Sequence, residues 1–376
     1  MQFEIEDGVL KKYTAEPGVT EAVIPNRVQV IGAGAFMNCT GLKRVVLPDG
    51  LRSIGEAAFQ RCSGLAEIRI PGSVTEIGRR AFYGCSALKQ ITLPEKLTDI
   101  CPSVFCGCEG LTALRLPESV RRISGDAFAH CSGLTALTIP RNVRSIGDNA
   151  FFKCSRLTEL VIPENVIYIG DRAFGYCENL TAILVSPDNP RYRSIDGAVY
   201  SRDGAELEFY PCGKKVFTLP DSLRKIQNFV FTGCRGPEVI RLHPDDPELR
   251  RPYREISTLS ATLLTGMEMI RTQNYTVPIN TTIKYVMIML QYLRTHDAEL
   301  AAYIKKHFAK IMQESIPAGD ICFIGDLVRS EEYFTKRNID RCIALAQEHR
   351  QAEILMLLLN YKNAHFGFDE SRRLKL

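Results

Sequence analysis

The sequence predicts an α/β protein in which a solenoid of 23-residue coils precedes a small all-α domain. Two observations lead to this fold class. Several residue types recur every 23 positions over the first part of the chain, and helical spacing replaces that period afterwards. Because a unit of this length cannot bury its apolar residues alone, the units are expected to stack and share one continuous core.

Five residue types carry the period. Cysteine, phenylalanine, proline, leucine and isoleucine each recur in steps of 23 residues over seven units. The phenylalanines run from Phe36 to Phe174 and the isoleucines from Ile31 to Ile169. Columns that stay in phase over this length indicate one structural unit repeated along an axis. The cysteine column consists of Cys39, Cys62, Cys85, Cys108, Cys131, Cys154 and Cys177.

One unit contains the signals of a short strand and a bend. The stretch Leu42-x-x-Val45-x-Leu47 alternates apolar residues with others, as a strand with one buried side does. Pro48 ends this strand, because proline has no amide donor for a sheet. Ile54 supplies a second inward edge, and Gly55 permits a tight bend.

The period is modified at both ends of the solenoid. An Asp7-Gly8 turn predicts an N-terminal hairpin that caps the first coil. The eighth unit is displaced, with Cys234 lying 57 residues after Cys177, and two further Asp-Gly turns in the gap predict a hairpin insertion at about residues 186–219. The expected domains are a solenoid at residues 1–243, a linker at residues 244–256 and a helical domain at residues 257–376.

The repeated unit resembles the BspA-type leucine-rich repeat, also described as the Treponema-type repeat. The motif Leu-x-x-Ile-x-Leu-Pro-x-x-Val-x-x-Ile-Gly-x-x-Ala-Phe-x-x-Cys matches over about residues 19–243. This resemblance implies a curved leucine-rich-repeat solenoid that binds proteins, often at bacterial surfaces, where some members are discussed as adhesins. The chain departs from that setting, because it shows neither a signal peptide nor a Leu-Pro-x-Thr-Gly anchor.

Helical spacing begins after the expected linker. Apolar residues recur at i, i+3 and i+4 in four runs, at residues 256–270, 283–293, 300–311 and 321–327. Asn338 or Asp340 is expected to cap a further helix that continues through Glu348. The very apolar stretch from Glu353 to Asn363 predicts the last helix, and these two helices look like one ankyrin-type pair.

Composition and charge exclude several classes of protein. The 376 residues are 45% hydrophobic and 24% charged, which excludes a wholly disordered or collagen-like chain. A net charge of +4 is too balanced to predict nucleic acid or a membrane surface as the partner. Without a signal peptide the expected location is the cytoplasm, and the alternative is the cell surface or secretion by a non-standard route.

A basic ladder also argues against nucleic acid. It contains Arg52, Arg121, Arg144 and Arg224 and is interrupted by Thr75, Thr98 and Ile167. A groove that follows a phosphate backbone would need a more continuous run of cations, with aromatic residues on which bases stack. No nucleic-acid partner is therefore expected.

The 13 cysteines raise the questions of metal and disulfides. The column cysteines fit small buried apolar side chains, although coils about 4.8 Å apart would just allow disulfides between them. Cys101, Cys106 and Cys108 form a C-x4-C-x-C cluster that suits a soft metal but has no evident fourth ligand. We expect reduced, structural cysteines, no metal and no cofactor. Since neither a phosphate-binding loop nor a His-Glu-x-x-His motif is present, no enzyme activity is expected.

The outward positions of the repeated strand, here called the strand face, are the candidate binding site. These outward residues vary along the chain while the inward columns are fixed. Such variation fits a face adapted to bind a partner, and it also fits sequence drift on a solvated face. Arg69 and Arg115 form a cationic part, and Val161 and Leu184 an apolar end, so a protein partner with an acidic patch is expected. The candidate binding residues are Arg44, Val46, Glu67, Arg69, Gln90, Thr92, Arg115, Thr138, Glu159, Val161 and Leu184.

These observations favour a non-enzymatic scaffold that binds an unidentified protein through the strand face. One alternative is a bacterial surface or exported adhesin that takes part in host interaction. Another is an effector whose activity resides in the helical domain. Oligomeric state does not follow from the sequence.

Overall fold

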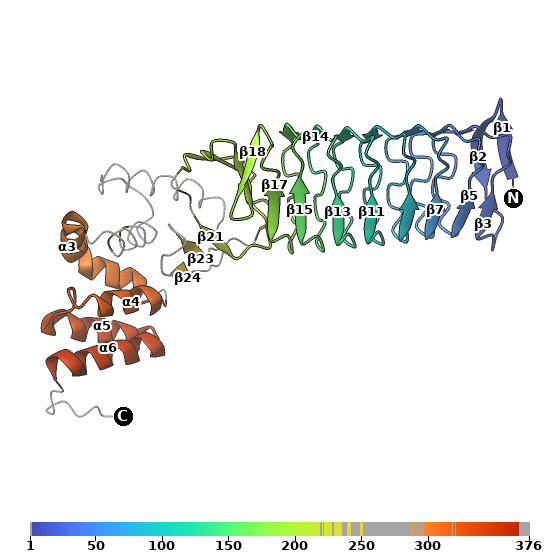
Figure 1. The fold of residues 1–376 in the computed structure, drawn as a ribbon. Helices are drawn as coiled ribbons and strands as arrows, with labels where there is room; N and C mark the ends of the chain where they lie inside the picture. Colours follow the sequence, from blue (N-terminus) through green and yellow to red (C-terminus); the bar gives the residue numbers. More distant parts are fainter. Residues whose placement is uncertain are drawn as a thin grey trace. The chain divides into compact units, whose positions relative to one another are not determined.

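The structure is a computed structural model that describes residues 2–218, 220, 222–227, 229–234, 239–241, 249–250, 288, 292, 297–317, 319 and 321–367. It divides into two compact units, Met1–Lys215 with Ser222–Gly236 and Val216–Asp221 with Pro237–Leu376. The first unit is a β-solenoid, and the second contains a small helical region (Figure 1). The predicted fold class is therefore confirmed.

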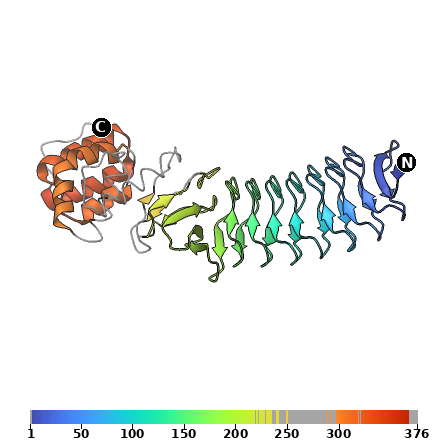
Figure 2. The same cartoon turned by 90° about the horizontal axis from the view of Figure 1, so that it is seen from above.

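Each regular coil of the solenoid contributes a longer and a shorter strand. The coils follow one another in sequence order along a gentle curve (Figure 2). The longer strands are β3 (Glu21–Val23), β5 (Arg44–Val46), β7 (Glu67–Arg69), β9 (Gln90–Thr92), β11 (Ala113–Arg115), β13 (Ala136–Thr138), β15 (Glu159–Ile162) and β17 (Ala182–Val185). The shorter strands are β4 (Val30–Ile31), β6 (Ser53–Ile54), β8 (Glu76–Ile77), β10 (Asp99–Ile100), β12 (Arg122–Ile123), β14 (Ser145–Ile146) and β16 (Tyr168–Ile169).

Strands of the same kind pair in parallel with a register of one period, as Ile31 with Ile54 shows. The ladders of the regular coils are interrupted in three places, because β8 does not pair with β10, β9 does not pair with β11 and β13 does not pair with β15. The first two interruptions fall near the bend in which Cys101 stands in place of glycine, but Ser124 also replaces the glycine of the next bend, where β12 pairs with both β10 and β14. Glycine is favoured there because the coils approach closely: a Cβ on Gly78 would lie 2.6 Å from the amide nitrogen of Glu56.

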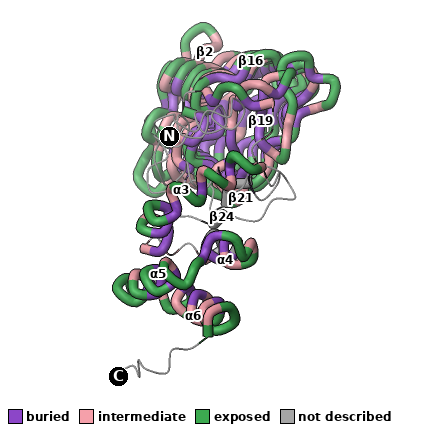
Figure 3. The backbone as a smooth tube through the Cα atoms, turned by 90° about the vertical axis from the view of Figure 1, so that its left-hand side faces the viewer, coloured by how far each residue is buried: buried purple, intermediate pink, exposed green. Residues whose placement is uncertain are grey.

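An aromatic ladder forms the centre of the solenoid. The rings from Phe36 to Phe174 stack on one another with centroids 4.9–5.9 Å apart. Stacking of this kind adds stability beyond the buried area alone. Figure 3 shows the buried residues gathered inside the coils with exposed residues around them.

The cysteine column lies beside the aromatic ladder. The Cys85 thiol donates to the carbonyl oxygen of Phe59 in the preceding coil at 3.1 Å. The same bond recurs at 3.0–3.2 Å for Cys62, Cys108, Cys131, Cys154 and Cys177. All six of these cysteines are buried, so they are part of the core, as the sequence predicts.

An antiparallel hairpin covers the first coil. It consists of β1 (Gln2–Glu6) and β2 (Val9–Thr14), and β2 pairs in parallel with β4. Tyr13 stacks on Phe36 with centroids 4.9 Å apart, and Phe3 lies 5.4 Å from Tyr13. The hairpin thus extends the aromatic ladder and covers the exposed end of the stack.

Two positions in each regular coil have a left-handed backbone. One contains Ala57, Arg80 and Ser103 at equivalent places, and the other contains Arg61 and Lys153. A residue other than glycine costs about 1–2 kcal/mol in this conformation. The hydrogen bonds and packing of the stacked coils must therefore outweigh a cost that recurs in each of these coils.

The inserted segment begins after β17. Its strands β18 (Tyr192–Ile195), β19 (Ala198–Ser201) and β20 (Glu206–Phe209) pair antiparallel in that order. Parallel pairing resumes when β20 pairs with β22 (Lys225–Ile226), with a register of 19 residues instead of 23. In the second unit, β21 (Val216–Thr218), β23 (Val239–Arg241) and β24 (Leu249–Arg250) form a separate sheet, so β24 lies inside the stretch expected to be a linker.

A buried asparagine satisfies the backbone at the start of this insertion. Asn189 is completely buried at the position where the regular coils place valine or leucine. Its Nδ2 donates to the carbonyl oxygens of Pro163 and Val166, and its Oδ1 accepts from the amides of Arg191 and Tyr192. These four hydrogen bonds satisfy backbone groups at the point where the 23-residue period changes.

The described helices are α3 (Ala298–Ser315), α4 (Ile321–Arg329), α5 (Lys336–Glu348) and α6 (Ala352–Phe366). α5 packs against α6 and α3, and α4 packs against α6. The N-cap of α5 is Thr335, so the prediction that Asn338 or Asp340 caps this helix was wrong. Asn338 instead completes a capping box, because Thr335 Oγ1 accepts from the Asn338 amide and Asn338 Oδ1 accepts from the Thr335 amide. The helices predicted at residues 256–270 and 283–293 lie outside the described residues, except for helical Ile288 and Tyr292.

Candidate functional site

The strand face consists of the outward side chains of the longer strands. In β7, Glu67 and Arg69 are exposed on either side of Ile68, which is buried. The same alternation places the other candidates outward, and all of them are exposed except Val46, which is half-buried. The structure thus puts all eleven candidates on β5 to β17, although it does not test whether they bind a partner.

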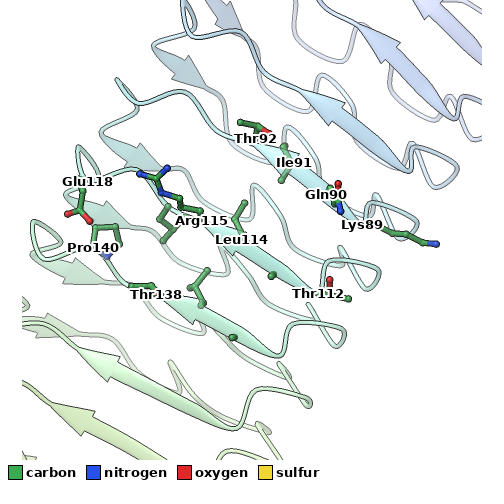
Figure 4. Close-up of a pocket in the computed structure, with 14 residues that line it drawn as sticks. Lys89, Gln90, Ile91, Thr92, Thr112, Leu114, Arg115, Glu118, Thr138 and Pro140 are labelled. Atoms are coloured by element: carbon green, nitrogen blue, oxygen red, sulfur yellow. The ribbon is translucent and has the colours of Figure 1, made fainter.

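Two hollows lie on the strand face. The first spans β5, β7 and β9 with a volume of about 790 Å³, and Arg44, Arg69 and Glu95 are among its lining residues. The second spans β9, β11 and β13 with a volume of about 650 Å³ (Figure 4). Because Gln90 and Thr92 line both, the two hollows are continuous across β9.

The second hollow arises from small side chains and from an interrupted sheet. Along one outward row, Gln90 is followed by Ala113 and Ala136 before Glu159 restores a long side chain. The hollow also crosses the junction at which β9 and β11 are unpaired. Two alanines between longer residues leave room for part of a partner, which is how concave binding sites are formed.

Cations and anions lie beside each other at two places on the face. Arg44 Nε lies 3.9 Å from Glu21 Oε1 and 3.8 Å from Glu67 Oε1, and Arg115 Nη1 lies 3.6 Å from Glu95 Oε1. Since these side chains are at least half exposed, each pair contributes little to stability. Their charges remain available to orient a partner.

Apolar side chains lie toward both ends of the face. Val161 is 50% exposed and Leu184 39% exposed, as the sequence predicts for that end. Val23, which is 58% exposed, was missed at the other end. It stands one period before Val46, so extending the row backward by 23 residues would have found it.

The thiols that might have bound a metal are not arranged to do so. Among the residues that the structure describes, no group of three or more His, Cys, Asp or Glu side chains could hold a metal ion. Burial, followed by the nearby Asp126 carboxylate, raises the pKa of Cys106 to about 11. Burial is also the main reason that the pKa of Cys101 is raised, so both thiols favour the protonated form, which is the weaker ligand.

One pair of cysteines differs from the expectation of reduced thiols. Cys212 and Cys234 form a disulfide. Cys212 stands 22 residues before Cys234, one residue short of the 23-residue period. The sequence did not reveal this, because the insertion shifts Cys212 out of phase with the regular column.

A third hollow lies in the helical region, between α3 and α5. Its volume is about 540 Å³, and Gln313, Arg337, Arg341 and Glu348 are among its lining residues. Cys342 also lines it, and burial raises the pKa of this thiol to about 12. Among the described residues, no helix is both long and apolar enough to cross a membrane.

Comparison with known families agrees with the repeat geometry. The model of the BspA type leucine rich repeat region matches in six copies at residues 11–135, 88–194 and 205–246. The chain belongs to this family. Its 23-residue coils, with two short parallel strands each, are the BspA-type repeats. No curated protein is significantly similar to the chain.

Solved structures of bacterial leucine-rich repeat proteins are also similar. A leucine rich cell surface protein from Faecalibacterium prausnitzii is 27% identical, with a TM-score of 0.53 over 62% of this chain and 72% of that one. A leucine rich repeat protein from T. pallidum is 32% identical, with a TM-score of 0.45 over 48% of this chain and 87% of that one.

Proposed function

We propose that this BspA-type protein is a non-enzymatic scaffold that binds a partner protein through its strand face. The observation that carries this proposal is the pair of continuous hollows on β5 to β13, formed where outward side chains vary above fixed inward columns. Family membership supports it, because solenoids offer extended surfaces suited to protein binding. A partner with an acidic patch fits Arg69 and Arg115.

Charge reversal on the strand face tests this function. The full chain, the double variant Arg69→Glu/Arg115→Glu and the matched control Arg52→Glu are used as baits for affinity capture. Arg52 is exposed but lies outside the strand face, beside β6. Proteins retained by the wild type and the control should be lost from the double variant, while all three baits unfold at the same temperature. Retention of the same proteins by the double variant would place binding elsewhere.

Display at a cell surface or export is a second candidate setting. It is supported by the structural similarity to the F. prausnitzii protein described as a leucine rich cell surface protein. Protease treatment of intact cells should then release peptides of this chain. Peptides that appear only after lysis would favour the cytoplasm.

An effector activity in the helical region is a further candidate, motivated by the polar residues that line the α3–α5 hollow. Arg341→Glu in the full chain should then abolish the activity without changing partner capture by the strand face. If the variant also loses the partners, the helical region contributes to binding instead.

A further inference from the structure

Two arginines stack on a face of the solenoid that the strand face does not include. Arg121 immediately precedes β12, and Arg144 immediately precedes β14 in the next coil. The Arg144 amide donates to the Arg121 carbonyl oxygen at 2.8 Å. Both residues are exposed. Because they occupy the same position in neighbouring coils, they lie about 4.8 Å apart along the stack.

Two arginines in or near shorter strands of the solenoid are paired with acids of the preceding coil. Arg79 Nε lies 3.4 Å from Glu56 Oε1, and Arg122 Nε lies 3.3 Å from Asp99 Oδ1. Within the described part of the chain, neither Arg121 nor Arg144 forms an ion pair. Like charges directly opposite each other in adjacent strands are destabilising. A carboxylate placed over both guanidinium groups would remove that repulsion and could accept hydrogen bonds from each.

Apolar side chains continue this row in the next coil. The Ile167 amide donates to the Arg144 carbonyl oxygen at 2.9 Å, so Ile167 follows directly after the arginine pair. Ile167 is 56% exposed and its neighbour Tyr168 is 53% exposed. Exposed apolar residues beside polar ones are typical of a protein interaction site.

Asp148 places a negative charge at one end of this surface. Its Oδ1 accepts from the Asp171 amide at 3.0 Å and lies 3.5 Å from the hydroxyl of Tyr168. This carboxylate therefore adjoins the tyrosine and repels an anion there. An acidic group of a partner is directed to the arginine pair, and its apolar group to Ile167 and Tyr168.

We propose that Arg121, Arg144, Ile167 and Tyr168 form a second interaction surface, which binds an extended acidic segment of a partner protein. Arg121 and Ile167 are two coils apart, about 10 Å, which matches three residues of extended chain at about 3.3 Å each. A glutamate or aspartate of the segment lies over the arginines and an apolar side chain lies over Ile167 and Tyr168. Two cations are too few to hold a nucleic-acid backbone, whose binding strength grows with the number of phosphates neutralised.

The proposal is tested with a defined probe and the full chain. The probe is a fluorescein-labelled peptide in which Glu-Glu precedes Phe in each of several repeats, and its analogue has Gln in place of Glu. Fluorescence anisotropy should show binding of the acidic peptide only, weakened by added salt. Arg121→Gln/Arg144→Gln should weaken binding about tenfold, since each exposed charge pair contributes up to about 1 kcal/mol. Arg52→Gln, an isolated arginine in the same row between Gln29 and Thr75, is the matched control and should change binding less than about twofold.

The apolar half of the surface requires its own variant. Ile167→Ser/Tyr168→Ser should weaken peptide binding about three- to tenfold at unchanged unfolding temperature, through loss of buried apolar area. The proposal is overturned if the Gln analogue binds equally well, or if both double variants bind like the wild type. Binding of phosphatidylglycerol vesicles or single-stranded DNA without binding of the acidic peptide would also overturn it. None of these outcomes depends on the strand face, so the proposed function is tested separately.

Discussion

The regular coils and the inserted segment bury their backbones by different means. In the regular coils each residue meets its own counterpart one period away, so the same ring stack and thiol bond recur. In the insertion, Asn189 stands where valine or leucine is regular, and Phe209 meets Phe174 edge to face. Repetition spreads stability over many equivalent contacts, whereas the insertion concentrates it in a few individual residues.

Removing a ring from the regular ladder should have the largest effect. Phe128 is completely buried between Phe105 and Phe151, at centroid distances of 5.6 and 5.5 Å. Phe128→Ala should lower the free energy of unfolding by about 3–5 kcal/mol, through lost apolar burial and the cavity left behind. Urea unfolding followed by circular dichroism measures this. Phe209→Ala is the comparison in the insertion and should cost less, because Phe209 is only partly buried; equal costs would contradict the contrast.

Reduction of the disulfide should come next. Cys212 and Cys234 close a loop that begins near the end of the insertion, and losing such a crosslink costs about 3 kcal/mol. A reductant should therefore lower the unfolding temperature of the wild type but not of Cys212→Ser. Cys85→Ser is the control from the regular column and should remain sensitive to reductant. Mass spectrometry of unreduced peptides checks the pairing, and a wild type insensitive to reductant would show that the pair is not formed in solution.

The buried asparagine should have a somewhat smaller effect. Asn189→Leu restores an apolar residue but leaves the amide of Tyr192 and the carbonyl oxygen of Val166 without their partner. A cost of about 2 kcal/mol is expected, because buried polar groups without partners lose their hydration. Hydrogen exchange should speed up in residues 186–212 but not in the regular coils. Asn142→Ala removes one exposed bond to the Glu118 carbonyl oxygen and should cost less than about 0.5 kcal/mol.

Alkaline pH should produce the most distributed effect. Burial raises the pKa of Cys85 and of Cys177 from 9.0 to about 12. The unfolded chain therefore loses these protons above about pH 9 while the folded chain keeps them, so stability is full below pH 9 and falls toward pH 12. Unfolding temperatures measured across this range should show a shallower decline in Cys85→Ala. An identical slope in the variant would mean that other groups cause the decline.

The repeated part of the fold was predictable because its signals are periodic. The fixed columns through Phe36, Ile31 and Cys39 located the coils and hence the outward rows of the strand face. The hollow at Ala113 and Ala136 was not predicted, since it depends on how neighbouring coils differ and on the missing pairing of β9 with β11. Where the period is broken, at Asn189 and Cys212, each contact is specific to one place and the sequence offers no second copy to compare.

The cap of α5 shows a similar limit. Thr335, Asn338 and Asp340 are all residues that favour helix N-termini, so the sequence alone allows several starts. Thr335 is selected because its bonds with Asn338 satisfy two amides at once. That reciprocity depends on backbone conformation, which composition does not determine.

Because equivalent strands pair with a register of one period, residues on the strand face are spaced in steps of one coil. Loss or duplication of 23 residues would bring every column back into line, so the core would close without a new contact. Arg69 and Arg115 would then move closer or farther by one coil, about 4.8 Å, while each kept its own surroundings. Recombination between repeats can therefore change the spacing of the proposed binding residues in fixed steps, without any change to the interior.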